Sequence, residues 1–203
     1  ARNFIRYLIP FFKDERYIKI DNARPLLFIY RPNSIPNPQE YINIWTQECL
    51  HGGINAPYVI ATLTRGATNP HEFGMDAGLE RILHDWAGGN LTNIKDYVQI
   101  HDKFDGNILL YDHVVDYYIQ SNKKKKKFTY FQSLVPTWDN TARYGKNAYI
   151  LHGSTPEKFQ YWLEDVISST QNKLTLDKQF IVINAWNEWA EGAYLEPDRY
   201  HGY

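Results

Sequence analysis

The stretch INAWNEWAEGAYLEPD, residues 183–198, places tryptophans and carboxylates side by side directly after an apolar run. Glu188 and Glu191 are three residues apart and are flanked by Trp186 and Trp189. Two carboxylates that share an apolar site repel one another, which drives their pKa values apart. One protonated and one ionised carboxyl group is the combination that glycosidic chemistry requires. The alternative from this pattern is a solvated acidic turn whose tryptophans belong to the core.

A second group of polar residues lies in PTWDNTARYG, residues 136–145. Trp138 offers a ring on which a sugar can stack, and Asp139 and Asn140 supply an acceptor and a donor for a pair of hydroxyl groups. Arg143 is placed to orient a carboxylate. The alternative is a structural turn at Asp139 and Asn140 that is held by a bridge between Asp139 and Arg143.

Short apolar runs rich in β-branched and aromatic residues predict the elements that must position these groups. The predicted strands are PLLFIY (25–30), PYVIATL (57–63), FTYFQSLV (128–135) and QFIVINAW (179–186). Their nearly continuous hydrophobicity favours parallel strands that are covered on both faces. Trp186 and Asn187 then lie beside the glutamates at the end of the last strand, where they shape the site.

Helical spacing of apolar residues occurs between these runs, at 37–53, 109–122 and 154–171. Residues 64–106 are irregular, and we expect a long loop there with a short helix around 76–87. Alternation of strands and helices predicts an α/β fold with a parallel sheet. Ligands of such folds bind at the carboxyl ends of the strands. Tyr30 and Arg31 follow the first strand and are further candidate ligand contacts.

The composition excludes several classes of function. The chain has 203 residues, a net charge of −1 and a pI of about 6.7, so no global field favours nucleic acid or an anionic membrane. No apolar run is long enough to span a membrane, and the run KKKKK at 123–127 is typical of a solvated loop. The single cysteine and the spacing of the histidines predict neither a disulfide nor a metal site. Aromatic residues reach 16%, which suits a surface that contacts sugars.

Four blocks of the sequence together resemble the WbsX-like family, which carries the label of a glycosyltransferase in lipopolysaccharide biosynthesis. They are KIDNARPLLFIYRP, PTWDNTAR, HGSTPEKFQYWL and INAWNEWAEGAYLEPD. The WbsX-like family is similar in turn to glycoside hydrolase family 99, the endo-α-mannosidases, which have a (β/α)8 barrel. Because four strand units are too few to close such a barrel, we expect residues 1–203 to form a single domain that is the C-terminal part of one.

The resemblance implies roles for the two glutamates. It implies that Glu191 is the general acid/base at the glycosidic oxygen, and that Glu188 is a base toward the sugar 2-hydroxyl in a route through a 1,2-anhydro sugar. The hydrolases have His where this chain has Ala190, so one polar contact of the hydrolases is absent.

Three functions follow as expectations. The first is a glycoside hydrolase that acts on α-mannose-like linkages of a bacterial polysaccharide without a cofactor. The second is a glycosyltransferase, against which the sequence lacks a DxD-like metal motif and a loop suited to a nucleoside diphosphate. The third is a non-catalytic glycan-binding protein. The sequence predicts neither the oligomeric state nor whether the compartment is the bacterial cytoplasm or the periplasm.

Overall fold

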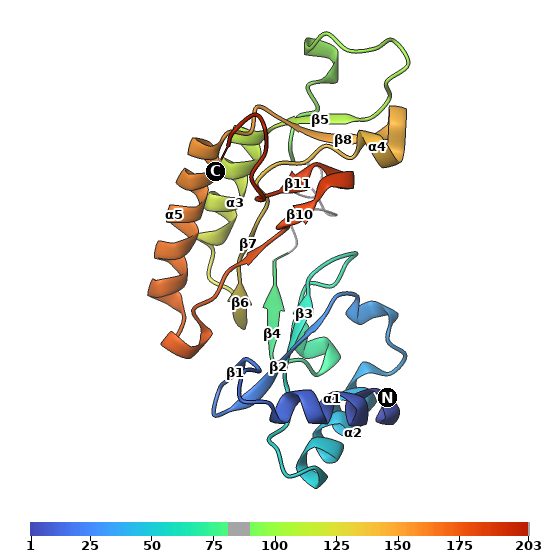
Figure 1. The fold of residues 1–203 in the computed structure, drawn as a ribbon, viewed down its shortest axis with the longest axis vertical. Helices are drawn as coiled ribbons and strands as arrows, with labels where there is room; N and C mark the ends of the chain where they lie inside the picture. The colour runs from blue at the N-terminus through green and yellow to red at the C-terminus, as the bar shows by residue number, and fades with distance from the viewer. Residues whose placement is uncertain (81–89, 203) are drawn as a thin grey trace. The chain divides into compact units, whose positions relative to one another are not determined.

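The computed structural model describes residues 1–80 and 90–202, which form a mixed α/β fold (Figure 1). The chain divides into two compact units. The first unit comprises residues 1–81, 126–131 and 173–180, and the second comprises residues 82–125, 132–172 and 181–203. Each unit has its own cluster of buried hydrophobic side chains. Within the described residues, every helix is too short or too polar to cross a membrane.

The first unit is built on a five-stranded sheet of order β1-β2-β3-β4-β6. Its strands are β1 (Lys19–Ile20), β2 (Arg24–Ile29), β3 (Tyr58–Thr62), β4 (Ala77–Leu79) and β6 (Thr129–Phe131). Strands β2, β3, β4 and β6 run parallel, and the short β1 pairs antiparallel with β2. The strands predicted at 25–30 and 57–63 and their parallel arrangement are therefore confirmed. Every residue of β3 is buried, as expected for the centre of such a sheet.

Helices α1 (Arg2–Lys13) and α2 (Pro38–His51) complete the first unit. Ile5 and Phe12 of α1 pack with Trp45 and Cys49 of α2 in one buried cluster. The Glu48 carboxylate on α2 forms ion pairs with two arginines of α1. The distances are 2.8 Å from Arg2 Nε to Glu48 Oε1 and 2.5 Å from Arg6 Nε to Glu48 Oε2. The helix predicted at 37–53 is confirmed as α2.

The predicted short helix around 76–87 is wrong where the structure describes it. Residues 77–79 form strand β4 between β3 and β6, and residues 81–89 lie outside the described part of the chain. A Cβ on Gly78 would lie 2.8 Å from Leu63 Cδ1 and 2.9 Å from Phe128 Cε2. No side chain therefore fits at Gly78, and this three-residue strand depends on its pairing with β3 and β6, of which a local apolar pattern gives no sign.

The second unit contains three two-stranded pairings, β5 with β8, β7 with β9 and β10 with β11. Its strands are β5 (Asn107–Leu110), β7 (Ser133–Leu134), β8 (Tyr149–His152), β9 (Val182–Ile183), β10 (Asn187–Glu188) and β11 (Ala193–Tyr194). Its helices are α3 (Tyr111–Asn122), the single turn α4 (Thr141–Tyr144) and α5 (Pro156–Lys173). The first two pairings are parallel and the third is antiparallel.

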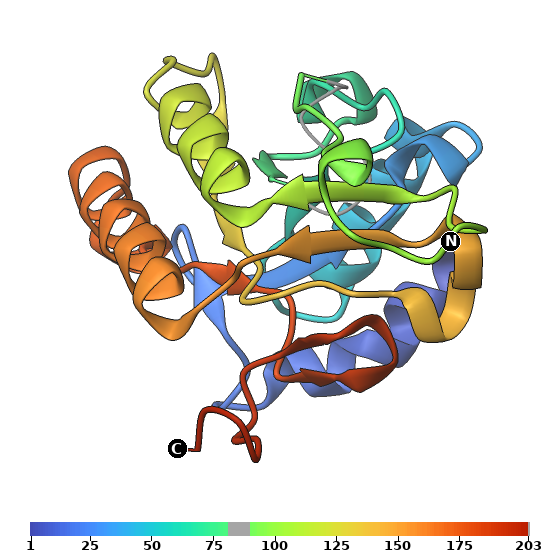
Figure 2. The same cartoon turned by 90° about the horizontal axis from the view of Figure 1, so that it is seen from above.

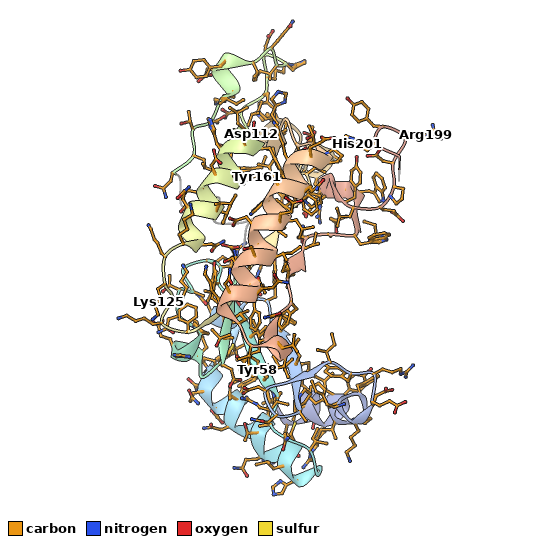
Figure 3. All side chains as sticks on the ribbon, turned by 90° about the vertical axis from the view of Figure 1, so that its left-hand side faces the viewer. Tyr58, Asp112, Lys125, Tyr161, Arg199 and His201 are labelled. Carbon is orange, nitrogen blue, oxygen red and sulfur yellow. The ribbon has the colours of Figure 1, made fainter. Side chains whose placement is uncertain are left out.

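Helices α3 and α5 lie side by side in both ribbon views (Figures 1 and 2). Tyr118 of α3 stacks on Trp162 of α5 with ring centroids 5.8 Å apart, and Trp162 is fully buried. At the other end Lys158 donates to Asp112, which stands at the start of α3 (Figure 3). The helices predicted at 109–122 and 154–171 are confirmed as α3 and α5. The first two residues of the former belong to β5 instead.

The other two predicted strands are shorter than expected. The run 128–135 is interrupted at Gln132 into β6 and β7, which pair with β4 and β9 respectively. Of the run 179–186 only Val182–Ile183 is a strand. Apolar sequence marks where these segments are buried, but the pairing partners decide how many residues enter a ladder.

Charged side chains gather at the amino ends of the strands of the first unit. Arg24 donates to Asp76 at 2.8 Å and to Asp21 at 3.2 Å, and Lys178 donates to Asp21 at 2.6 Å. The hydrogen bond from Lys178 and the nearby Arg24 hold the pKa of the Asp21 carboxyl below its usual range. A carboxyl group whose pKa is lower in the folded state stabilises the fold above its unfolded pKa, and this contribution is lost as the pH falls through the folded value.

We predict that Asp21→Asn lowers the urea midpoint most at neutral pH, and that the difference from the parent shrinks below about pH 4. Asparagine tolerates the positive φ of 49° at this position, so the backbone is retained. Urea unfolding at pH 7 and pH 3 measures the effect, with Glu15→Gln, an exposed carboxylate of the same unit, as the control. An equal shift at both pH values would contradict the assigned role of Asp21.

Candidate active site

The two candidate glutamates lie in a tight hairpin of the second unit. Asn187 of β10 pairs with Tyr194 of β11, and Glu188 pairs with Ala193. A 3-10 turn at Trp189–Glu191 connects the strands. Gly192 follows with φ 59° and ψ 23°, a left-handed conformation that glycine adopts without strain.

The hairpin is fixed against the segment that follows β7. The Asp139 backbone N–H donates to the Glu191 carbonyl at 2.9 Å. A Cβ on Gly192 would lie 2.8 Å from Asp139 N and 2.9 Å from Asp139 O, so the two backbones touch at this point. The NEWAEG and PTWDNTAR segments, which are about fifty residues apart in the sequence, are therefore neighbours in the fold.

Arg143 and Glu191 form an ion pair across this contact. An Arg143 guanidinium nitrogen donates to Glu191 Oε1, and the two side chains are 51% and 21% exposed. A charge-assisted hydrogen bond of this kind holds a carboxylate in one orientation. The guanidinium contacts Glu191, whereas the alternative from the sequence placed it on Asp139.

Glu188 and Asn187 are exposed on β10. Glu188 is also the residue before the 3-10 turn, and a turn of this kind brings residues i and i+3 to the same side. This favours a common orientation of the Glu188 and Glu191 side chains. The hairpin therefore presents one carboxylate held by Arg143 and another that faces solvent.

The tryptophans of the motif form an open aromatic surface on the hairpin. Trp186 and Trp189 are 60% and 49% exposed. Trp189 stacks on Tyr194 with ring centroids 3.9 Å apart, and its indole N–H donates to Glu196 at 2.7 Å. The acidic-turn alternative required these tryptophans to belong to the core, and their exposure contradicts it. The candidate site residues predicted from the sequence omit Trp189, Tyr194 and Glu196, although all three lie within residues 183–198.

Trp138 and Asn140 are structural residues in this arrangement. Trp138 is 3% exposed and belongs to the hydrophobic core of the second unit, which differs from the predicted open stacking ring. Asn140 is 7% exposed and its side-chain oxygen accepts the Tyr149 N–H at 2.7 Å. The polar neighbours of Trp138 in the sequence gave no sign of its burial, which follows from packing against α3 and α5.

Asp139 forms the turn that was the alternative to a ligand contact. Its Oδ1 accepts the Thr141 backbone N–H at 2.9 Å and the Thr141 hydroxyl at 2.5 Å. An aspartate that bonds the backbone two residues ahead stabilises such a turn. This bond starts helix α4, which carries Arg143. Asp139 thus positions Arg143.

Tyr30 and Arg31 belong to the first unit and not to the unit of the glutamates. Tyr30 is 53% exposed, and the Arg31 guanidinium carbon lies 5.7 Å from its ring centroid. The loop that carries them lies beside the loop after β3, because Asn33 donates to the Arg65 carbonyl at 3.0 Å. Their contact with a ligand of the glutamates stays a prediction.

The described residues 1–80 and 90–202 contain no group of three or more His, Cys, Asp or Glu residues arranged to hold a metal ion. The hairpin and the Arg143 side chain bring together carboxylates, one guanidinium and aromatic rings.

A family model described as glycosyltransferase WbsX matches residues 1–203. This chain belongs to that family. Two curated relatives, both called uncharacterized protein WxcX and from two strains of Xanthomonas campestris pv. campestris, are 29% identical over 98% of the chain. The chain spans only 28% of the length of these relatives.

Solved structures with a similar fold include glycoside hydrolase-type proteins. A glycoside hydrolase-like protein superimposes with a TM-score of 0.58 at 11% identity, covering 96% of this chain and 52% of the other. The GH99 endo-α-mannosidase from Bacteroides thetaiotaomicron gives a TM-score of 0.52 at 18% identity, with 97% and 51% covered. Its complex with bis-tris-propane gives 0.51 at 19% identity, with 100% and 57% covered. The WbsX-family chain therefore shares a fold with about half of each of these proteins.

We predict that Gly192→Ala destabilises the protein by about 1–3 kcal/mol, because the new Cβ adds a steric clash with Asp139 to the strain of a positive φ. Urea unfolding measures the loss. Gly53→Ala is the matched control, since Gly53 has φ 74° and no atom within 4 Å of its Cβ position. Equal losses in both variants would show that backbone strain alone acts at Gly192.

Proposed function

We propose that this WbsX-family chain carries the acid/base site of a glycoside hydrolase-type enzyme that acts on α-mannose-like linkages in a bacterial polysaccharide. The observation that carries the proposal is the hairpin that presents Glu188 and Glu191 between two exposed tryptophans, with Glu191 held by Arg143. The fold shared with an endo-α-mannosidase supports the substrate class. The activity proposed is that of the whole protein, because this chain spans only 28% of the length of its curated relatives.

The two carboxylates divide the chemistry between them. Glu188 removes the proton of the sugar 2-hydroxyl, whose oxygen attacks C1 while Glu191 gives its proton to the departing glycosidic oxygen. The product is a 1,2-anhydro sugar and a free leaving-group hydroxyl. Water then attacks C1 as Glu191 takes its proton, and Glu188 returns a proton to O2, so both side chains end as they began.

Arg143 has to leave Glu191 for the first step, because Glu191 donates a proton in that step and a carboxylate in an ion pair has no proton to give. The Arg143 side chain is 51% exposed and stands on the single turn α4, so it is free to move onto a hydroxyl group of the glycan. The tryptophans supply apolar ring faces beside the reacting sugar.

We predict that Glu191→Gln and Glu188→Gln each reduce cleavage of α-mannan oligosaccharides by about 10²–10⁴-fold, the usual contribution of a positioned acid or base. Mass spectrometry of the products measures the loss. Glu164→Gln, an exposed carboxylate on α5, is the control and leaves cleavage unchanged. Full activity in either active-site variant would exclude that residue from the mechanism.

We also predict that Arg143→Met lowers the turnover rate more than it changes the Michaelis constant, because Glu191 then acts as the ionised base of the second step without a fixed orientation. Arg143→Lys retains the positive charge and is expected to restore part of the rate. Steady-state kinetics on one oligosaccharide measure both constants. If Arg143→Met changed only the Michaelis constant, Arg143 would bind substrate without positioning Glu191.

The second candidate function is transfer of a sugar from a nucleotide donor, which the name of the family favours. A sugar nucleotide at a hundred times its dissociation constant would stabilise the fold by about 2.7 kcal/mol, enough to raise the melting temperature by roughly 5 °C or more. We predict no such rise. A clear rise without cleavage of α-mannan would replace the hydrolase proposal with the transferase.

A further inference from the structure

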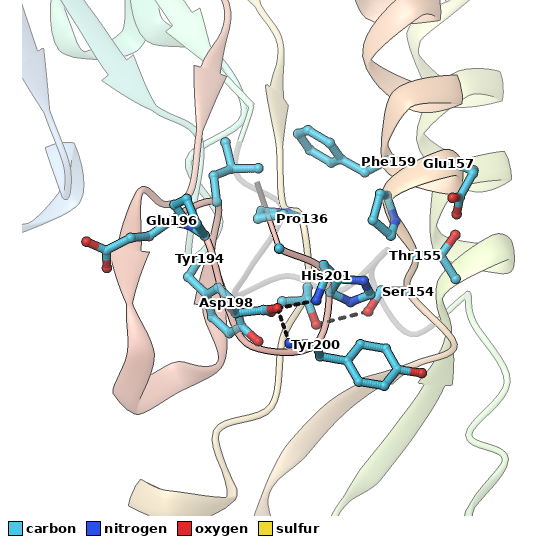
Figure 4. A pocket seen from close by; sticks show the side chains of 15 residues that line it. Pro136, Ser154, Thr155, Glu157, Phe159, Tyr194, Glu196, Asp198, Tyr200 and His201 are labelled. Carbon is cyan, nitrogen blue, oxygen red and sulfur yellow. Dashed lines mark hydrogen bonds between the residues drawn. The ribbon is translucent and has the colours of Figure 1, made fainter.

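A cavity of about 650 Å³ lies within the second unit, next to the hairpin that carries Glu188 and Glu191. Three segments line it, namely residues 136–137 after β7, residues 154–157 and 159 at the start of α5, and residues 194–198 and 200–202, which begin at the end of β11. Figure 4 shows Tyr194 and Glu196 on one side, Thr155, Glu157 and Phe159 on the other, and Asp198 and His201 between them. The volume falls in the range of about 300–1,000 Å³ found for small-molecule sites.

Hydrogen bonds fix the walls of this cavity. Asp198 Oδ1 accepts the backbone N–H groups of Tyr200 and His201 at 2.8 and 2.5 Å, which closes the turn at the end of the described chain (Figure 4). Across the cavity the Ser154 hydroxyl donates to the Thr137 hydroxyl at 3.0 Å. Two of the three lining segments are thus joined directly, and the third is a closed turn.

The charges that face the cavity are mainly negative. Glu157, Glu196 and Asp198 contribute carboxylates, and His201 is the sole lining side chain able to carry a positive charge. A hydrogen bond from the His201 backbone N–H lowers the pKa of Asp198, and one from the Thr155 hydroxyl lowers the pKa of Glu157. Both carboxyl groups are therefore ionised at neutral pH. A phosphate or diphosphate is repelled by such a wall.

The remaining lining groups suit a sugar. Phe159, Tyr194 and Tyr200 supply aromatic rings, and Tyr200 is 89% exposed, so its ring is available to a ligand. Burial and a hydrogen bond to Asp198 raise the pKa of Tyr194, so its neutral hydroxyl is held against the Asp198 carboxylate in the wall of the cavity. Rings, carboxylate acceptors and hydroxyl groups together match a molecule with apolar C–H faces and many hydroxyl groups.

We infer that this cavity is a second glycan-binding site, which takes a neutral sugar unit. It shares Tyr194 and Glu196 with the catalytic hairpin, where both contact Trp189. It lies on the other face from Glu188, because successive residues of a strand point to opposite faces and Tyr194 therefore faces away from the side of Ala193 and its partner Glu188. Neither candidate catalytic glutamate lines it. The inference does not depend on cleavage by these glutamates.

The test uses the 203-residue chain with Glu191→Gln, which removes turnover, and titrates it with neutral α-mannose oligosaccharides. The readout is the imidazole proton resonance of His201 in NMR spectra, assigned with a His201→Gln variant, because this ring lies in the cavity. We expect the His201 resonance to shift on binding. Tyr200→Ala should weaken this binding about tenfold, and Ser154→Trp should abolish it by filling the cavity. Tyr161→Ala, an exposed tyrosine of α5 outside the cavity (Figure 3), should leave it unchanged.

Three outcomes would overturn the inference. They are a His201 resonance that does not respond to any neutral oligosaccharide, affinities that are equal in the parent and the cavity variants, and tighter binding of a sugar nucleotide or of cationic glucosamine than of the neutral sugar. Failure of the proposed function is distinguishable, since it appears as absent cleavage by the parent while the His201 titration is retained. Cleavage by the parent without a His201 response would contradict the second glycan-binding site and leave the proposed function intact.

Discussion

The close approach of two backbones at Gly192 and Asp139 is the constraint on which the candidate site depends. The Asp139 N–H bonds the Glu191 carbonyl, and no side chain fits between the two segments. This contact sets the position of the Glu191 main chain. The Asp139 side chain meanwhile starts the turn that carries Arg143. One short segment thus fixes the carboxylate from its backbone side and from its side-chain end.

The hydrophobic core of the second unit supports this contact from below. Trp138 and Ala193, the neighbours of Asp139 and Gly192 in sequence, are both buried in the same cluster. Trp138 therefore acts on the site by anchoring the segment that precedes Asp139, although it presents no open ring. Polar groups that have to hold one geometry are well placed on elements whose neighbours are locked by packing.

Most long elements and the local motifs were predictable from the sequence, whereas helix α1, the short strands and the burial of single residues were not. Helices α2, α3 and α5 and strands β2 and β3 each carry a periodic or continuous apolar pattern that reports their own burial. Strands β4, β7 and β9 have two or three residues and depend on partners far away in the sequence. Trp138 illustrates the second limit, because its polar neighbours suggested exposure while the helices packed over it decide the opposite. The pairing of Arg143 with Glu191 depends on the same long-range contact.

The charges on the hairpin bear on the choice between a transferase, which the name of the family suggests, and a hydrolase, which the similar fold suggests. Binding of a nucleoside diphosphate calls for clustered cations or helix amino termini that face the phosphates. The hairpin of the second unit instead presents Glu188 and Glu191, and its guanidinium from Arg143 is already engaged with one of them. A diphosphate placed there would meet a solvent-facing carboxylate and would compete with Glu191 for Arg143. A neutral glycan meets no such repulsion, and its hydroxyl groups can donate to both carboxylates, so the charges on the hairpin favour proton transfer on a sugar over recognition of a phosphorylated donor.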